Sequence, residues 1–212
     1  MKRGFNLLVG MAVFSMLLAL PARAAGPIQL PSPQMEGGKP LMQALKERMT
    51  TRAFGEGKLA PQMLSNLLWA AFGINRPDGR RTAPSAKNWQ EFDIYVLNAD
   101  GSFLWDSKRN VLNPIGDKDI RAMAGTQAFV KEAALNLVYV ADYAKVSGGA
   151  DKDVWVGADA GFIGQNVYLF CASEGLATVV RASIDKENLG KELKLRPEQK
   201  IILSQSVGWP KK

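Results

Sequence analysis

The stretch "DVWVGADAGFIGQNVYLFCASEG", from Asp153 to Gly175, decides the fold class of this chain. Its apolar residues continue without a proline, which predicts one long helix over residues 153–174 that ends at Gly175. The helix is hydrophobic on nearly every side, so we expect it to be buried all round. It is also rich in small residues that let a second helix approach closely: Gly157, Ala158, Ala160, Gly161 and Gly164. One domain of this size would struggle to bury such a helix alone, so a homodimer core is predicted.

The segments around this helix predict strands mixed with further helices. The apolar run "LNLVYVAD" (135–142) is typical of a central buried strand. "EFDIYVL" (91–97) and "SFLWDS" (102–107) flank Asp100-Gly101, a strong hairpin signal, so this pair of strands should be antiparallel. Two more strands are predicted over 176–182 and 199–209, and helices over 40–50, 60–74, 117–132 (short, broken at Gly125) and 185–193. Such intermixing predicts an α+β layer structure.

The N-terminal segment is typical of a secretory signal. Lys2 and Arg3 precede an apolar run over 5–20, and "PARA" before Ala25 fits a signal-peptidase site. We therefore predict a signal peptide over 1–24, cleavage after Ala24, a periplasmic or otherwise exported protein, and no membrane contact after cleavage. The alternative is a retained membrane anchor, since the run is near the lower limit for spanning.

After the predicted cleavage, the chain divides into two parts. Residues 25–39 are rich in Pro and Gly and predict an extended arm, and residues 40–212 predict a single domain. Without Lys2, Arg3 and Arg23, the 27 basic residues fall to 24 against 20 acidic ones, a net charge of +4. These charges form no Lys/Arg stripe, so nucleic acid is not an expected partner.

Two absences limit the chemistry. The chain has no histidine and one cysteine, Cys171, within an apolar helix where it is expected to be a core residue. A Ser-His-Asp triad, a Cys-His pair, a His-based zinc site and an intrachain disulfide are therefore excluded, and no metal site is predicted. Glu91, Asp93 and Asp159 are interpreted as structural. If the protein is an enzyme, an organic cofactor should carry its chemistry.

Three polar segments are candidate ligand contacts. In "KERMTTRAF" (46–54), Arg48, Thr50 and Arg52 follow the end of a helix and could hold a phosphate, although a basic helix C-terminus would also complement the helix dipole. The loop before the first hairpin strand carries Ser85 and Asn88 after Pro84, and could equally be only a polar lead into that strand. A third segment ends a strand in small residues, Ala182 and Ser183, which would let a planar ligand approach the backbone.

In this order, the segments resemble the FMN-dependent nitroreductase family. The Arg-x-Thr-x-Arg of 48–52 is similar to its "RRSxRxF" opening, and "APSAKNWQEFDIYVL" (83–97) to its "PSSxNxQPWxFxVV" loop and strand. "AGFIGQNVYLFCASEGLATVV" (160–180) resembles its dimer-core helix and strand, and "ILSQSVGWP" (202–210) its terminal "VxVGYP". The segments over 102–115 and 119–125 resemble most the branch that contains azoline-oxidising dehydrogenases.

The resemblance implies an α+β fold with a mostly antiparallel central sheet flanked by helices and a long, buried dimer-interface helix. It implies FMN bound at a homodimer interface, with both subunits contributing to each site. The flavin N5 then carries the chemistry, and no side chain is assigned a catalytic role. The implied cofactor contacts are Arg48, Thr50 and Arg52 near the phosphate and pyrimidine edge, Pro84, Ser85, Ala86 and Asn88 from the other subunit, Val180, Arg181, Ala182 and Ser183 against the ring, and Lys211.

Some positions depart from the family pattern. Ala86 stands where the family has a second Ser, and Met49 where it has Arg or His, which removes a phosphate donor. Lys211 could supply the cation that the family often has after "GYP". Arg80, Arg81 and Arg181 are alternative phosphate partners that the sequence does not separate.

The predicted function is FMN-dependent two-electron hydride transfer, by a ping-pong mechanism, to small-molecule acceptors such as nitro compounds or quinones. NAD(P)H is a possible donor, although it is scarce outside the cytoplasm, so another donor could serve an exported protein. Two alternatives stay open. One is an exported flavin-binding or ligand-binding protein of the same fold without turnover, and the other is an exported interaction domain without a cofactor.

Overall fold

The computed structural model describes residues 26–212, so the predicted signal peptide lies outside the described residues. Seven strands of this part form one sheet in the order β1-β4-β3-β2-β5-β7-β6, and neighbouring strands all run antiparallel. The strands are β1 (Ile28–Gln29), β2 (Phe92–Asn98), β3 (Gly101–Asp106), β4 (Val111–Gly116), β5 (Leu135–Asp142), β6 (Ala177–Arg181) and β7 (Gln199–Gly208). The predicted α+β class with an antiparallel sheet is confirmed.

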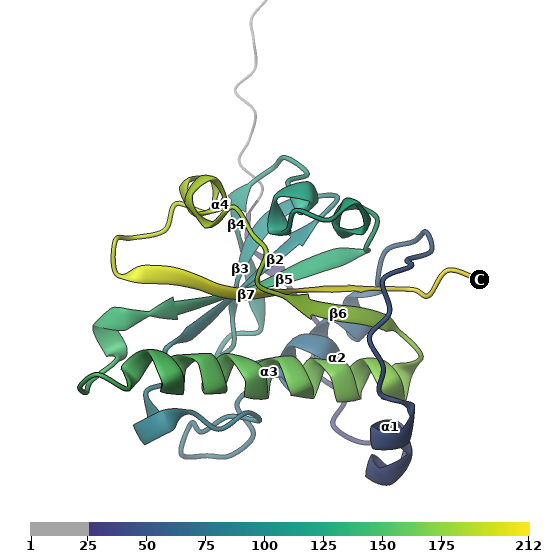
Figure 1. Ribbon diagram of the computed structural model, residues 1–212. Helices are drawn as coiled ribbons and strands as arrows, with labels where there is room; N and C mark the ends of the chain where they lie inside the picture. The colour runs from purple at the N-terminus through teal and green to yellow at the C-terminus, as the bar shows by residue number, and fades with distance from the viewer. Residues whose placement is uncertain (1–25) are drawn as a thin grey trace, which may run out of the picture.

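Helices cover both faces of the sheet. They are α1 (Leu41–Glu47), α2 (Pro61–Phe72), α3 (Lys152–Glu174) and α4 (Lys186–Glu192), with 3-10 turns η1 (Ala86–Asn88), η2 (Arg121–Ala124), η3 (Ala128–Lys131) and η4 (Tyr143–Lys145). Figure 1 shows α3 running along one face together with α1 and α2, while α4 and the turns η2 and η3 cover the other. None of the helices within residues 26–212 is long and apolar enough to cross a membrane.

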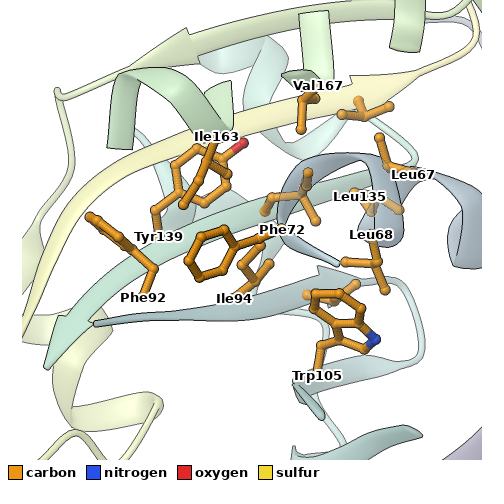
Figure 2. Close-up of a cluster of buried hydrophobic side chains, with 14 of the residues drawn as sticks. Leu67, Leu68, Phe72, Phe92, Ile94, Trp105, Leu135, Tyr139, Ile163 and Val167 are labelled. Carbon is orange, nitrogen blue, oxygen red and sulfur yellow. The ribbon is translucent and has the colours of Figure 1, made fainter. Parts of the chain in front are cut away.

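The main core lies between the sheet and the α2–α3 layer. Alternation along β2 sends Phe92, Ile94 and Val96 into this core and Tyr95 and Leu97 into a second core under α4. In Figure 2, side chains of α2, β2, β5 and α3 converge on Phe72. Phe72 meets Phe92 edge to face, with ring centroids 6.5 Å apart. Burial on both faces explains why β5 reads as a continuous apolar run.

The extended arm before α1 is held to the domain by strand pairing and by hydrogen bonds between its backbone and side chains of α2. Residues of β1 pair with β4, and Leu30 is buried beside them. Further along, the Ser65 hydroxyl of α2 donates to the Pro31 carbonyl at 2.5 Å, and the Gln34 N–H donates to Asn66 at 2.8 Å. The arm therefore extends across the end of the sheet and onto α2.

Two details of the predicted fold are wrong. Strand β4 was not predicted as a strand, and residues 117–132 form two short 3-10 turns in place of a helix. The break at Gly125 is confirmed, because Gly125 follows η2 with an extended backbone and η3 begins only at Ala128. Gly175 ends α3 in the left-handed conformation, as predicted, with φ 71°.

Within the single chain, α3 is buried on one face only, and burial of its other face by a second copy stays a prediction. Its inward face carries Val156, Ala160, Ile163 and Val167, which are fully buried. Its outward face leaves three large apolar side chains exposed: Val154, Trp155 and Phe162. A Cβ added at Gly157 or Gly161 would meet nothing within 4 Å, so this face is also open to close approach.

Candidate functional site

Tyr168, on the C-terminal half of α3, joins three segments that are far apart in the sequence. Its phenol oxygen lies 3.0 Å from the Thr50 hydroxyl and accepts the Val180 backbone N–H at 3.1 Å. The guanidinium carbon of Arg48 lies 5.4 Å from the centroid of its ring, in cation–π range. The first predicted segment and the end of β6 therefore meet at one place.

The backbone fixes this junction. Arg48 caps α1 with its N–H, which donates to the Ala44 carbonyl at 2.9 Å as the chain turns out of the helix. Further along, the Thr51 N–H donates to the Thr178 carbonyl of β6 at 3.0 Å. Residues 48–52 thus pass along the edge of the sheet that β6 forms.

Arg48 and Arg52 have guanidiniums that are free for a ligand. Among the described residues, neither forms an ion pair or a side-chain hydrogen bond with a protein group. Arg48 is half-buried and Arg52 is exposed. Two unneutralised guanidiniums beside a hydroxyl suit an anion, because Arg binds phosphate oxygens in a bidentate way.

The C-terminal tail brings Lys211 to the same edge. Its N–H donates to the Ala53 carbonyl at 3.2 Å, and the Gly55 N–H donates to the Trp209 carbonyl at 2.8 Å. Phe54 and Pro210 form an antiparallel bridge between these bonds. Lys211 therefore lies beside the residue that follows Arg52, and it is exposed.

The second predicted segment, Pro84 to Asn88, forms a tight loop around η1. Ser85 organises it, since its hydroxyl accepts the Gln90 N–H at 2.8 Å. Lys87, Asn88 and Gln90 all have left-handed backbones, with φ of 50°, 56° and 47°. Such conformations are uncommon for residues other than Gly and persist only where neighbouring contacts hold them.

A hollow of about 300 Å³ lies against this loop. Its lining is basic and polar: Arg76, Arg80, Arg81, Ala83, Pro84, Ser85, Asn88 and Gln90. Arg81 does not reach out into it as a free cation, because its guanidinium donates to the Phe72 carbonyl, to Ser107 and to Gln90. Arg80 is exposed and pairs with Asp78 at 3.4 Å. Because its guanidinium is already used in these contacts, Arg81 has a structural role.

Within one chain, the loop and the Arg48–Thr50 junction do not meet. The loop is held to α3 by the Ala86 N–H, which donates to Asp159 at 2.8 Å, whereas the junction contacts Tyr168. These two helix positions are nine residues apart, so they are separated by about 13 Å along the axis at 1.5 Å per residue. The residues predicted for the site therefore lie in two groups toward opposite ends of α3.

The side chain of Arg181 lies on the face of β6 away from Tyr168, so it cannot bind a ligand beside Tyr168. Its guanidinium is buried on the opposite face, donates to Asn136 at 2.7 Å and to the Val179 carbonyl, and burial lowers its pKa to about 10. The side chain of Arg181 is therefore not placed to bind a phosphate, because it is enclosed in the core. The backbone beyond it is open, since Ala182 and Ser183 are exposed.

Two acidic residues under the loop were interpreted as merely structural, yet they contact it directly. Glu91 faces Ser85 and Asp159 accepts the N–H of the next residue, Ala86, and both carboxyl groups are buried, at 0% and 2% exposure. Burial, then the neighbouring Asp159, raises the pKa of Glu91 to about 7. Burial also raises the pKa of Asp159. No local sequence signal marks the pairing, because the partners belong to separate elements.

Tyr168 was also missed. It is a polar-tipped aromatic residue in an apolar helix, and buried tyrosines usually need a hydrogen-bond partner, which is the one available signal. Among residues 26–212, no group of three or more His, Cys, Asp or Glu is placed to hold a metal ion.

The sequence profile of the Nitroreductase family matches residues 45–209. The chain belongs to the nitroreductase family. This is an oxidoreductase family, and both groups of residues described above lie inside the matched range, apart from Lys211. The nitroreductase identification on the motifs is thereby confirmed.

Individual nitroreductase-like proteins agree with this placement. A crystal structure from Ralstonia eutropha JMP134, described under the name nitroreductase, has a TM-score of 0.85 and 36% identity, and the match covers 90% of this chain and 92% of that one. A protein of Methanocaldococcus jannaschii that carries a nitroreductase name is 28% identical over 175 residues, 77% of this chain and 88% of its own. The NADPH:FMN oxidoreductase of Vibrio harveyi has a TM-score of 0.61 at 19% identity, covering 81% of this chain and 69% of that one, which supports the fold alone.

Proposed function

We propose that this nitroreductase-family protein is an FMN-dependent oxidoreductase that works as a homodimer. The observation that carries the proposal is the junction at Tyr168, where Thr50, the Val180 N–H and the Arg48 guanidinium converge. The Vibrio harveyi neighbour is an NADPH:FMN oxidoreductase, which is consistent with a flavin at such a site. Bound FMN would supply two-electron hydride chemistry at its N5 atom.

The residues at the junction suit a flavin phosphate. Arg48 and Arg52 are uncompensated by any carboxylate among the described residues, and Lys211 adds a third cation along the same edge. Because the phenol oxygen of Tyr168 accepts from Val180, its own proton is available to Thr50. The Thr50 hydroxyl proton can then be donated to a phosphate oxygen.

A second copy of the chain would complete the site. A twofold axis perpendicular to α3 would make the two copies of this helix antiparallel, so the half of α3 that holds the Pro84–Asn88 loop would lie near the other half of the partner helix. The exposed Val154, Trp155 and Phe162, with the open Gly157 and Gly161, provide an apolar face for this contact. The exposed side chains of Leu41, Met42 and Leu45 on α1, and of Met49 just after it, extend the apolar surface.

In the proposed dimer, each part of the chain has a distinct task. Arg48, Thr50, Arg52 and Lys211 bind the phosphate and the pyrimidine edge, and Pro84, Ser85, Ala86 and Asn88 of the partner subunit close over the ring. The backbone from Val180 through Arg181 and Ala182 to Ser183 lies against the ring, where small side chains permit close approach. The loop would exclude water from the reacting atoms.

The proposed reaction is ping-pong. A donor, NAD(P)H or another two-electron donor, leaves before a nitro compound, quinone or related acceptor enters the same cleft. Export through a signal peptide over residues 1–24 belongs to the same proposal, with an arm over 25–39 and the domain over 40–212. An exported enzyme would favour a donor other than NAD(P)H.

The test is the absorption spectrum of the protein purified from the periplasmic fraction. We expect a yellow protein that bleaches with dithionite or NADPH under anaerobic conditions and regains its colour with a nitroaromatic compound or a quinone. A yellow protein that cannot be reoxidised by any acceptor would favour the flavin-binding alternative. Colourless protein that cannot be reconstituted with FMN would contradict the proposal, and an intact N-terminal Met1 in the periplasmic material would contradict cleavage after Ala24.

A further inference from the structure

A pair of buried carboxyl groups lies directly beneath the Pro84–Asn88 loop. Glu91 immediately precedes β2 and Asp159 is on α3, and each faces one of two consecutive loop residues, Ser85 and Ala86. Two carboxylates can only accept hydrogen bonds, so a direct bond between the two groups requires one proton on the pair.

The surroundings of Glu91 and Asp159 favour one proton on the pair over two negative charges. Ser85 faces Glu91 from the loop at 3.4 Å, and the Ala86 N–H faces Asp159. Tyr143 of η4 faces the pair from the sheet side, but its hydroxyl donates to Asp153. Lys152 and Lys200 lie over the Tyr143 ring, and among the described residues no Lys or Arg pairs with either carboxyl. Two buried like charges without a cation are strongly unfavourable.

The protonated oxygen can be assigned from the contacts. Oε2 of Glu91 accepts the Ser85 hydroxyl, while Oε1 is buried and receives no donor from the described residues. A protonated carboxyl oxygen donates a hydrogen bond, so its neighbour should be an acceptor and not a donor. Oε1 thus fits the oxygen that carries the proton, while Asp159 accepts the Ala86 N–H.

The loop depends on these two residues. Asp159 fixes the Ala86 N–H, and Glu91 fixes Ser85, whose hydroxyl in turn holds the Gln90 N–H. Lys87, Asn88 and Gln90 need such support because their backbones are left-handed. Removing the proton would place two charges under the loop and push apart the groups that anchor it.

We infer that Glu91 and Asp159 share one proton and act as positioning residues, holding the Pro84–Asn88 loop in its ligand-binding conformation. The inference rests on the proposed function only for the identity of the ligand. Loop opening exposes Glu91 to water, where its carboxyl ionises at a lower pH. Rising pH therefore shifts the equilibrium toward the open loop. The shift begins near the ordinary pKa of a Glu side chain and ends near the raised pKa of Glu91 in the closed state, and a further rise in pH has no more effect.

The first experiment follows the loop without any flavin. Hydrogen exchange of the segment around Ala86 is measured in the full-length protein from about pH 5 to about pH 8 and corrected for intrinsic exchange. Protection should fall by at least about tenfold across this range in the wild type, and by less than about twofold in Glu91→Gln, whose amide donates to Asp159 without titrating. Asp93→Asn is the matched control, since Asp93 is a half-buried acid of β2 that also has a raised pKa but lies on the opposite face of the sheet. It should follow the wild type.

The second experiment measures the FMN dissociation constant over the same range. The wild type should bind more weakly as pH rises, with a steeper dependence than Glu91→Gln. The FMN phosphate titrates equally in both measurements, so the difference belongs to the protein. If Glu91→Gln does not fold, Asp159→Asn is used, which also removes the second charge.

The outcomes separate the two ideas. A Glu91→Gln exchange profile that follows the wild type, or an Asp93→Asn profile as flat as that of Glu91→Gln, overturns the shared-proton inference. The absence of FMN binding at every pH, with the exchange profiles as expected, would leave the positioning pair in place and reject FMN as the ligand.

Discussion

The phenol oxygen of Tyr168 lies 3.0 Å from the hydroxyl of Thr50, although 118 positions separate the two residues. The same oxygen accepts the Val180 N–H, so one atom ties the segment after α1 to the end of β6. Removing that atom should disturb both partners while leaving the ring and its contact with Arg48 in place.

Tyr168→Phe tests this relationship. The free energy of unfolding should fall by about 1–3 kcal/mol, because the partly buried Val180 N–H loses its acceptor. FMN should also be held less tightly. Urea unfolding and flavin titration measure the two effects. Tyr143→Phe is the control, since its hydroxyl bonds the exposed Asp153 away from the junction. Equal flavin affinities in the two variants would argue against a role for the Tyr168 oxygen in the site.

Arg48→Ala combined with Arg52→Ala should abolish FMN retention and leave the dimer intact. The two guanidiniums are half-buried or exposed and support no ion pair among the described residues, so their loss should not unfold the protein. Flavin content after purification and light scattering measure the outcome. Lys108→Ala with Arg109→Ala removes the same charge at two exposed positions elsewhere and should retain FMN. Unchanged flavin content in the first variant would mean that the phosphate site is assigned to the wrong residues.

Trp155→Glu should produce a folded monomer. Trp155 is 53% exposed on the outward face of α3, so a charge costs little in the single chain but would be buried unpaired in the proposed interface. The variant should also lose FMN, because each site needs the partner's loop. Light scattering and circular dichroism provide the measurement. Ile28→Glu, at an exposed position of the edge strand β1, should stay dimeric. A dimeric Trp155→Glu protein would exclude this face as the interface.

Gly125→Ala should destabilise the protein by about 1–3 kcal/mol through overpacking. The added Cβ would overlap Nε of Arg181 and lie 3.0 Å from its Cδ, and Arg181 is confined by its bond to Asn136. Urea unfolding gives the comparison, with Gly149→Ala as the control because its Cβ would meet nothing within 4 Å. If Gly125→Ala and Gly149→Ala have the same free energy of unfolding, the Arg181 side chain must be able to move away from residue 125 despite its bond to Asn136.

The elements that the sequence predicted well are those with a clear local period. Alternation marked β2, Asp100-Gly101 marked its hairpin, and Gly175 marked the end of α3. Strand β4 was missed because it contains Pro114, which weakens a strand signal, and it pairs with β3 through an irregular register. Between the turns over 117–132, Gly125 approaches Arg181 closely, a long-range contact that no local pattern encodes.

For the candidate site, short motifs predicted segments but not their connections. Arg48 and Thr50 could be named because they follow a helix end within one motif. Tyr168, Glu91 and Asp159 could not, because each acts through a partner from another element, such as the Ala86–Asp159 bond across 73 positions. Likewise, periodicity could indicate that α3 is apolar all round but not which face a single chain leaves uncovered.

The position of β7 has a consequence for how the domain forms. Residues 199–208 pair with β5 on one side and β6 on the other, so the two parts of the sheet are joined only by a strand made after both. Such pairing between distant residues has a high contact order, which slows folding. The edge at β6 that holds Thr51, and with it the Tyr168 junction, cannot be fixed to the rest of the sheet until residues 199–208 are available to pair. We therefore expect any cofactor to be captured late, by an already collapsed chain, so that its supply should affect the final yield of folded protein more than the early steps of folding.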